Sequence, residues 1–173
     1  MSKSTQMSSQ IRCMVHADLA QVLAWRNHPE VRRYMYTHHE ITVDEHLEWF
    51  ERTSLDPKKH LLIFELNQQP RGFVNFNEKG VGGISDWGFY MAPDSPRGSG
   101  RQLGRAALCH AYTQLKLHKV CGQALAYNQR SILLHQSLGF QQEGTLRDQH
   151  FDGERYHHVI CFGLLSHEWQ PNT

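Results

Sequence analysis

The chain has 173 residues, with 18 basic and 17 acidic side chains and a formal net charge of +1. Its length is that of one ordinary domain, and its apolar content of 39% is enough for a core. No apolar run approaches the roughly twenty residues needed to cross a bilayer. The near-neutral charge argues against a broad grip on nucleic acid. We therefore expect one domain that binds neither membrane nor nucleic acid and that holds any anion at a local site.

Residues 1–10 are polar and rich in Ser and Gln, which predicts a disordered N-terminus ahead of a domain over residues 11–169. This segment lacks the apolar core of a signal peptide, so a cytoplasmic protein is expected. The four cysteines form no CxxC pair, which predicts reduced, mostly buried thiols: Cys13, Cys109, Cys121 and Cys161. The thirteen histidines form no HExxH motif and no ligand-spaced cluster, so no metal is expected.

The first part of the domain predicts one strand followed by helices. Residues 11–15 are short and apolar-rich, as in a strand, and Asp18 is placed to cap a helix that runs through Trp25. Proline lacks an N–H and restrains the residue before it, so His28-Pro29 interrupts that helix. A second short helical turn is expected over residues 29–35.

The pattern then changes from helical to extended. Thr42 and Glu45 have the spacing of a capping box and open a helix that carries His46, Leu47, Trp49 and Phe50. Stretches rich in β-branched and aromatic residues, separated by turn residues, predict an antiparallel meander of three strands. These stretches are residues 60–66, 72–77 and 84–91.

Helices and strands alternate in the remaining chain. We expect a loop at 93–100, a helix at 101–116, a strand at 120–126, a helix from the cap Asn128 to Leu138, a terminating Gly139, and a hairpin of 140–149 with 156–165. The whole order predicts a mixed α/β (α+β) fold with an antiparallel half.

The segment after the strand that ends near Met91 carries the clearest chemical signal. Arg97 and Arg101 flank Gly98-Ser99-Gly100 at the entrance of a long helix. Glycines let backbone N–H groups approach an anion, and the unpaired N–H groups and dipole of the first turn hold it. This chemistry suits a pyrophosphate, although a flexible loop without a ligand would have the same composition.

Two other phosphate-binding loops are excluded by spacing. The Walker pattern requires Gly-Lys-Ser/Thr, which is missing, and the dinucleotide pattern requires a glycine where Leu103 stands. The preceding antiparallel meander also fits neither of those parallel folds.

With this loop, the chain resembles the GNAT N-acetyltransferases, whose pyrophosphate motif is Q/R-x-x-G-x-G/A after a strand. The motif can be aligned in two registers. Residues 97–102 match it except at Gln102, where a small residue is usual, and residues 101–106 match it at every position. We prefer the first register for its position relative to the strand. The resemblance implies a single domain with a central, mostly antiparallel sheet that splays after the fourth strand, and acetyl-CoA as co-substrate.

A second motif strengthens the resemblance. Asn128-Gln129-Arg130-Ser131, followed by Gly139-Phe140, looks like the family's N-x-x-[A/S]…Y-x-x-x-G-F segment, with His135 in place of the tyrosine. The resemblance implies contacts to the coenzyme from one set of residues: Met91, Arg97, Gly98, Ser99, Gly100, Arg101, Gln102, Asn128 and Ser131. Helix capping is an alternative role for Asn128, and it does not exclude the first.

Acetyl transfer to an amine needs an N–H donor for the thioester carbonyl, a proton for the leaving thiolate and a base for the amine. The resemblance suggests the backbone N–H of Met91 for the first. His135 is the candidate donor to the thiolate, because imidazole titrates near neutrality. The alternative for His135 is a structural hydrogen bond. His46 is a weak candidate for the base, and a water chain would serve equally well.

The N-terminal half resembles the PseH-type subgroup at Trp25-Arg26-Asn27, Val31-Arg32, Met35, Ile41, His46 and Trp49-Phe50, as does the segment 117–122. The subgroup acetylates the 4-amino group of UDP-4-amino-4,6-dideoxy-N-acetyl-β-L-altrosamine on the way to pseudaminic acid, so a UDP-amino sugar is the expected substrate. The acceptor-side set is Arg26, Arg32, Met35, Tyr36, His46 and Trp49. Arginines pair with diphosphates and aromatics stack on uracil, although Met35 and Trp49 also fit core positions.

Two kinds of alternative stay open. The wider neighbours resemble RimJ/RimL-like acetyltransferases of a protein N-terminus, an amino acid or a polyamine. A non-catalytic CoA-binding domain would carry the same coenzyme motifs. The sequence leaves the oligomeric state open, with a homodimer as one possibility.

Overall fold

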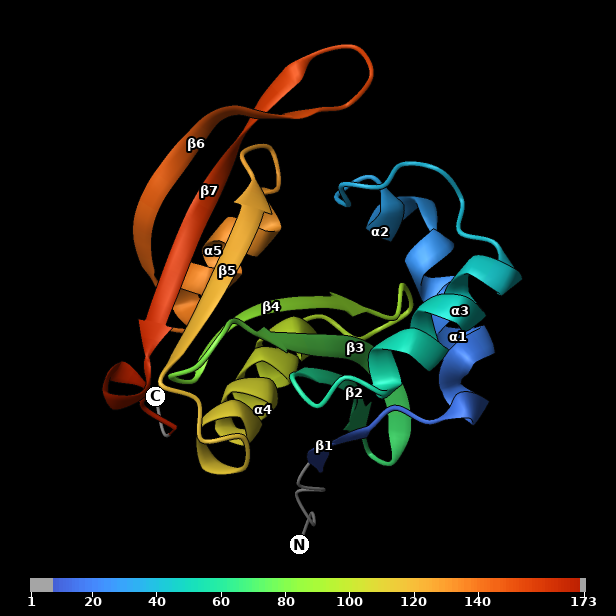
Figure 1. Ribbon diagram of the computed structural model, residues 1–173, viewed down its shortest axis with the longest axis horizontal. Helices are drawn as coiled ribbons and strands as arrows, with labels where there is room; N and C mark the ends of the chain where they lie inside the picture. The colour runs from blue at the N-terminus through green and yellow to red at the C-terminus, as the bar shows by residue number, and fades with distance from the viewer. Residues whose placement is uncertain (1–7, 172–173) are drawn as a thin grey trace, which may run out of the picture.

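Seven strands form one mixed sheet in the computed structural model, which describes residues 8–171 (Figure 1). The strands are β1 (Ser9–Cys13), β2 (Lys59–Leu66), β3 (Gln69–Glu78), β4 (Ile84–Met91), β5 (Lys119–Leu125), β6 (Gln141–Phe151) and β7 (Tyr156–Leu165). Their order in the sheet is β1-β2-β3-β4-β5-β7-β6. The predicted α+β fold and the antiparallel meander of β2, β3 and β4 are confirmed.

The sheet splays where β4 meets β5, as predicted. This pair is parallel, and its register covers only Ile84–Asp86 against Lys119–Cys121. Beyond it, β4 continues to Met91 along β3, while β5 continues to Leu125 along β7. Figure 1 shows the two halves of the sheet diverging from this point, so the second half of β4 has an edge that faces an opening.

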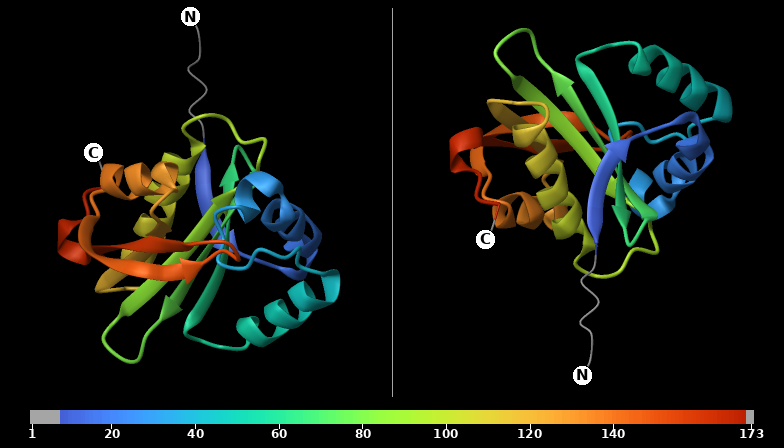
Figure 2. Two further views of the ribbon diagram at one scale, coloured as in Figure 1. Left: turned by 90° about the horizontal axis from the view of Figure 1, so that it is seen from above. Right: turned by 90° about the horizontal axis from the view of Figure 1, so that it is seen from below.

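Helices cover the two faces of the N-terminal half of the sheet (Figures 1 and 2). The helices are α1 (Leu19–Asn27), α2 (Pro29–Arg32), α3 (Val43–Ser54), α4 (Ser99–Thr113) and α5 (Gln129–Ser137), with 3-10 turns at His16–Asp18 and Ser166–Glu168. Helices α1 and α3 lie on one face, and α4 lies on the other against β1, β2 and β4. Helix α5 packs beside α4 and against β5.

Strand β2 is buried on both faces, which explains its continuous apolar run. Leu62 and Phe64 enter the core beneath α4, whereas Leu61 and Ile63 enter the core beneath α1 and α3. Successive side chains of a strand point to opposite faces, so each face receives alternate residues.

Two predicted helix caps are confirmed in detail. The Thr42 hydroxyl accepts from the N–H of Glu45 at 3.2 Å, and the Glu45 carboxylate accepts from the N–H of Thr42 at 2.7 Å. Asn128 Oδ1 accepts from the N–H of Ser131 at 3.1 Å, and Gly139 follows α5 with a left-handed φ of 90°. Both caps are local interactions between residues three apart, which sequence patterns identify directly.

Three details differ from the sequence expectations. Asp18 precedes α1 without a side-chain cap, because its carboxylate accepts hydrogen bonds from Arg12 and from the N–H of Val15. Cys13 and Cys109 are exposed, so the prediction of mostly buried thiols is wrong; all four cysteines are free. Ser9 already belongs to β1, and residues 1–7 of the predicted disordered N-terminus lie outside the described residues.

Candidate active site

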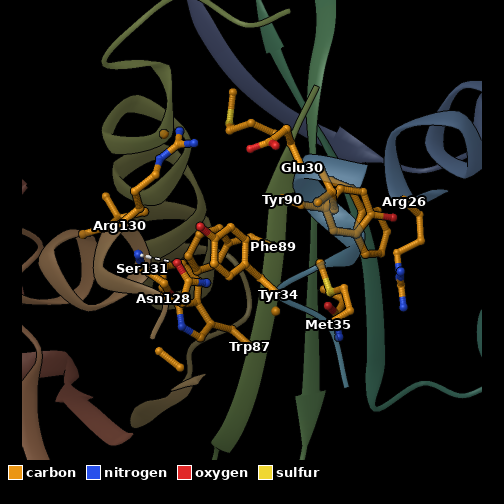
Figure 3. Close-up of a pocket in the computed structure, with 18 of the residues that line it drawn as sticks. Arg26, Glu30, Tyr34, Met35, Trp87, Phe89, Tyr90, Asn128, Arg130 and Ser131 are labelled. Atoms are coloured by element: carbon orange, nitrogen blue, oxygen red, sulfur yellow. Dashed lines mark hydrogen bonds between the residues drawn. The ribbon is translucent and has the colours of Figure 1, made fainter. Parts of the chain in front are cut away.

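A cleft of about 1400 Å³ opens at the splay between β4 and β5. Its lining comes from α1, the segment 30–49, β3, β4, β5, the entrance of α4 and the face of α5. In Figure 3, Asn128, Arg130 and Ser131 lie on one side of the β4 ribbon, and Arg26 and Met35 lie on the other. The cleft therefore has two ends on opposite sides of the sheet edge, as a reaction between two substrates requires.

The first end, called the coenzyme end below after the co-substrate expected there, lies at the entrance of α4. Gly98 precedes the helix with a left-handed φ of 86° and provides no side-chain cap. Glycine adopts this conformation without strain, and the first turn of a helix leaves backbone N–H groups for a ligand. Arg97, Arg101 and Arg130 line the same end, and none of their guanidinium groups has a partner among the described residues. The combination is suited to a pyrophosphate.

Two residues of the predicted loop set do not line this cleft. Ser99 is buried, and its N–H donates to the carbonyl of Pro96 at 3.2 Å. Gln102 donates its N–H to the carbonyl of Gly98 at 3.4 Å. Because helix positions turn by about 100° per residue, Gly100 and Arg101 face the cleft while Ser99 faces the core.

The alternative register, residues 101–106, lies inside α4 rather than at its entrance. Gly104 in that register serves packing, because a Cβ on it would be 2.5 Å from Leu138 Cδ1. The cleft therefore favours the register that begins at Arg97.

The free edge of β4 presents N–H groups to the opening. The N–H of Ala92 donates to the Arg71 carbonyl beside β3 at 2.7 Å. Backbone N–H groups alternate in direction along a strand, so those of Met91 and Phe89 point away from β3 and toward the splay. Met91 also lines the cleft. This geometry agrees with the donor expected for a thioester carbonyl.

Asn128 and Ser131 line the cleft from the entrance of α5 (Figure 3). The Asn128 side chain uses its oxygen for the helix cap, which leaves its amide nitrogen to donate elsewhere. Capping and a ligand contact are thus compatible in one side chain.

His135 lies in a site that fixes it as a neutral ring. Its Nε2 accepts from the Trp87 indole N–H at 3.1 Å, and its Nδ1 lies 2.8 Å from the Ser131 carbonyl. An indole nitrogen only donates, so Nε2 is the acceptor and Nδ1 carries the proton. Gly122 makes room for this pair, because a Cβ there would be 2.3 Å from Nε2.

The expected role of His135 as proton donor to the thiolate does not fit this geometry. The ring is 1% exposed, and burial lowers its pKa to about 4. The nitrogen without a proton is occupied by Trp87, and the other is occupied by Ser131. The structural hydrogen bond, which was the alternative for this residue, is what the contacts support.

We predict that His135 stays neutral in the folded protein from pH 8 to pH 5. Because its folded pKa lies below the ordinary value of about 6.5, its contribution to stability is present above that value and is lost as the pH falls toward 4. A histidine NMR titration, with His135→Gln to assign the resonance, checks this. A His135 resonance that titrates near pH 6.5 would contradict the assignment.

The second end of the cleft, called the acceptor end below, holds two buried nitrogens that have no hydrogen-bond partner among the described residues. Arg26 Nη2 donates to the Thr37 carbonyl at 3.2 Å, but Arg26 Nη1 has no partner among the described residues. His46 is 6% exposed, stacks on Trp49, and its Nε2 also has no partner among those residues. Burial lowers the pKa of both groups. A buried donor without a partner is costly, so Arg26 is suited to an anionic group on a ligand.

The structure brings most of the predicted acceptor set together. Met35, Tyr36 and Trp49 line the cleft with Arg26 and His46. Trp49 also packs against Phe73, so its core and cleft roles coexist. Arg32 does not line the cleft; it lies 3.7 Å from Glu40 in an exposed ion pair.

Several lining residues were not identified from the sequence. Tyr34 and Tyr90 line the acceptor end, and Arg130 lines the coenzyme end. Arg130 is two residues after the Asn128 cap, so its position in the first turn of α5 was a usable signal. No sequence pattern points to the tyrosines, because they reach the cleft through the fold.

The carboxylates of the cleft already have intramolecular partners. Glu30 pairs with Arg33 at 3.3 Å, and Asp86 pairs with Lys79 at 2.6 Å. Glu45 caps α3 and contacts His39. The acceptor end therefore presents a guanidinium nitrogen, Arg26 Nη1, that no described residue satisfies, rather than a free carboxylate.

Within residues 8–171, no group of three side chains is arranged to hold a metal ion. No helix in this part of the chain has the length and apolar character that crossing a membrane requires.

Comparisons with known proteins agree with this architecture. The family model for the acetyltransferase (GNAT) domain matches residues 10–141. The SPbeta prophage-derived uncharacterized N-acetyltransferase YokL of Bacillus subtilis (strain 168) is 35% identical over 89 residues, which are 50% of this chain and 50% of that relative. Acetyltransferase PseH of Campylobacter jejuni is 29% identical over 127 residues, 71% of this chain and 76% of that protein.

A third relative is similar over nearly its whole length. The spermidine N(1)-acetyltransferase of Vibrio cholerae is 25% identical over 168 residues, 94% of this chain and 97% of that protein. The crystal structure of spermidine N-acetyltransferase from Vibrio cholerae in complex with CoA and spermine has a TM-score of 0.86 at 23% identity, and the match covers 92% of this chain and 96% of that one. The family match and the shared fold together show that this chain belongs to the GNAT family and is an N-acetyltransferase of that type.

Proposed function

We propose that this chain transfers the acetyl group of acetyl-CoA to the 4-amino group of a UDP-linked amino-dideoxy sugar, UDP-4-amino-4,6-dideoxy-N-acetyl-β-L-altrosamine. The observation that carries the choice of an anionic acceptor is the buried Nη1 of Arg26, which no residue of the described chain satisfies and which lies beside a neutral His46. The resemblance to the PseH-type subgroup, and the similarity to PseH of Campylobacter jejuni, support the sugar nucleotide in particular.

The coenzyme would lie along α4 and α5. Arg97, Arg101 and Arg130, with the N–H groups around Gly98 and Gly100, would hold its pyrophosphate. The amide nitrogen of Asn128 is available for the pantetheine arm. The N–H of Met91 would donate to the thioester carbonyl at the free edge of β4, where charge develops during transfer.

His46 would accept the proton of the acceptor amine. Its hydrogen bond to the backbone of Leu19 uses Nδ1, because Nε2 has no hydrogen-bond partner in the part of the chain that the structure describes. The lone pair of Nε2 is then free, and burial keeps the ring neutral. A neutral imidazole with a free lone pair is suited to general base chemistry near neutral pH.

Polyamines are the main alternative acceptors, given the similarity to a spermidine N(1)-acetyltransferase. A polycation would bind through carboxylates, and to reach those of Glu30, Glu45 and Asp86 it would first have to displace their present partners. Acetylation of a protein N-terminus or of an amino acid, and coenzyme binding without catalysis, are further alternatives.

Release of free thiol from acetyl-CoA tests these functions in one assay. We expect saturable turnover with the UDP-amino sugar, and at least about 100-fold lower kcat/KM with spermidine, amino acids or an N-terminal peptide, because they lack the diphosphate. A preference for spermidine would overturn the sugar acceptor. Tight acetyl-CoA binding with no turnover on the whole panel would favour the non-catalytic alternative.

A further inference from the structure

Residues 33–41 form a strap over the acceptor end of the cleft. Tyr34, Met35, Tyr36 and Thr37 line the cleft from this strap. Figure 1 shows the segment between α2 and α3 extending toward the arm formed by β5, β6 and β7. The strap thus bridges the two halves that the splay separates.

The strap is fixed on its own side by the N-terminal helices. Asn27 makes two hydrogen bonds of 2.8 Å with the backbone of Ile41, and Arg26 donates to the carbonyl of Thr37. These contacts belong to the helical half and anchor the strap on that side.

Within residues 8–171, three hydrogen bonds join the strap to the opposite half. Tyr127 Oη donates to the Arg33 carbonyl at 3.1 Å, and Tyr36 Oη donates to Gln123 Oε1 at 3.0 Å. The third joins His38 Nε2 and His150 Nε2 at 2.9 Å. In this third bond, His150 belongs to β6, close to the turn of the β6–β7 hairpin.

We propose that His38 and His150 are positioning residues, whose hydrogen bond holds the strap closed over the acceptor site and releases it when both rings are protonated. Two imidazoles that meet through Nε2 need one ring to donate and the other to accept. The first proton added to the pair can bind at a Nδ1 and leave this bond intact. The second proton removes the last accepting lone pair and places two cations side by side.

The surroundings of His150 oppose that second proton. The ring is 8% exposed and lies against Tyr36 at 5.2 Å between centroids. His157 is its cross-strand partner, and His38 faces it from the strap. Asp152 favours the charged form, but it is engaged by His157. Burial and the neighbouring histidines together lower the pKa of His150. The strap therefore stays closed above the ordinary histidine pKa of about 6.5 and opens as the pH falls below it.

Amide hydrogen exchange of the full chain without ligand tests the proposal and needs no acetylation. The N–H groups of Tyr34, Met35 and Ile41 are hydrogen-bonded and report on the strap. After correction for intrinsic exchange rates, we expect the protection factors of residues 33–41 to fall about tenfold between pH 7.5 and pH 5. This is the change in the opening equilibrium that the loss of one hydrogen bond causes. Helix α1 is the internal reference and should not change.

Two variants at the exposed His38 separate the bond from its titration. His38→Ala removes the bond, so protection should be low at both pH values. His38→Gln can donate to a neutral His150 and accept from a protonated one, so protection should persist at both. The proposal is overturned if the wild type shows no pH dependence, if His38→Ala matches the wild type at pH 7.5, or if His38→Gln loses protection at pH 5.

A kinetic readout links the strap to the acceptor and rests on the proposed function. His38→Ala should raise the acceptor KM about fivefold to tenfold and leave the KM for acetyl-CoA unchanged. Normal exchange behaviour with an inactive enzyme would count against the proposed function alone. An unchanged acceptor KM in an active enzyme would count against the strap.

Discussion

Replacing Arg26 with methionine is expected to lower kcat/KM for the UDP-amino sugar by about 100-fold, mainly through the acceptor KM. Arg26 Nη1 is a buried donor that no described residue satisfies, and a charged hydrogen bond of this kind contributes about 1.5–3 kcal/mol. Methionine keeps much of the side-chain volume and removes the charge. Steady-state kinetics with saturating acetyl-CoA measure the effect.

Arg32→Met is the matched control, because it removes the same charge from the same region. Arg32 lies outside the cleft lining and pairs with the exposed Glu40, so a change of less than about threefold is expected, as for most exposed ion pairs. Equal effects of the two substitutions would contradict the acceptor site. An unchanged dissociation constant for acetyl-CoA would show that Arg26→Met is folded.

Local patterns predicted most of the fold. The Thr42–Glu45 and Asn128 caps, the extended stretches of β2, β3 and β4, and the hairpin of β6 and β7 each depend on residues close together in the chain. Such features follow from propensity, turn chemistry and periodicity. The splay itself came from the family resemblance, because the divergence of β4 and β5 is set by packing far from either strand's own sequence.

Arg26 and Arg32 illustrate what local patterns do not provide. Both were expected beside the acceptor, yet only Arg26 lines the cleft. The break at His28-Pro29 separates the helices that carry them, and a sequence pattern does not give the angle between two helices. The break was predicted, but its effect on which arginine faces the cleft was not.

The tautomer and hydrogen-bond partners of His135 also could not be predicted from the sequence. Its tautomer is set by Trp87, which is 48 residues away. The room for that contact comes from the missing Cβ of Gly122 on a third element. The motif position suggested an acid, whereas the tertiary contacts leave neither ring nitrogen available. Tyr90 was missed for a related reason, because its place at the acceptor end depends on how β4 packs against α1.

The Arg97→Met/Arg101→Met double variant is expected to lower kcat/KM for acetyl-CoA by about 100-fold, and to leave kcat/KM for S-acetylpantetheine within about threefold of the wild type. Both guanidinium groups line the coenzyme end, and neither has a partner within residues 8–171. S-acetylpantetheine carries the thioester but no pyrophosphate, so it does not use these arginines. If each contributes about 1.5 kcal/mol to binding, two together give about 100-fold.

The double variant Arg147→Met/Arg155→Met removes the same net charge from the β6–β7 hairpin, outside the cleft lining. Its selectivity for acetyl-CoA over S-acetylpantetheine should equal that of the wild type, since a remote charge acts only through screened, long-range attraction. A loss of selectivity in this control would mean that overall charge, and not the turn at Gly98, attracts the coenzyme. Equal losses with both donors in the Arg97 and Arg101 variant would instead place these arginines at the reacting thioester, because only that part is common to the two donors.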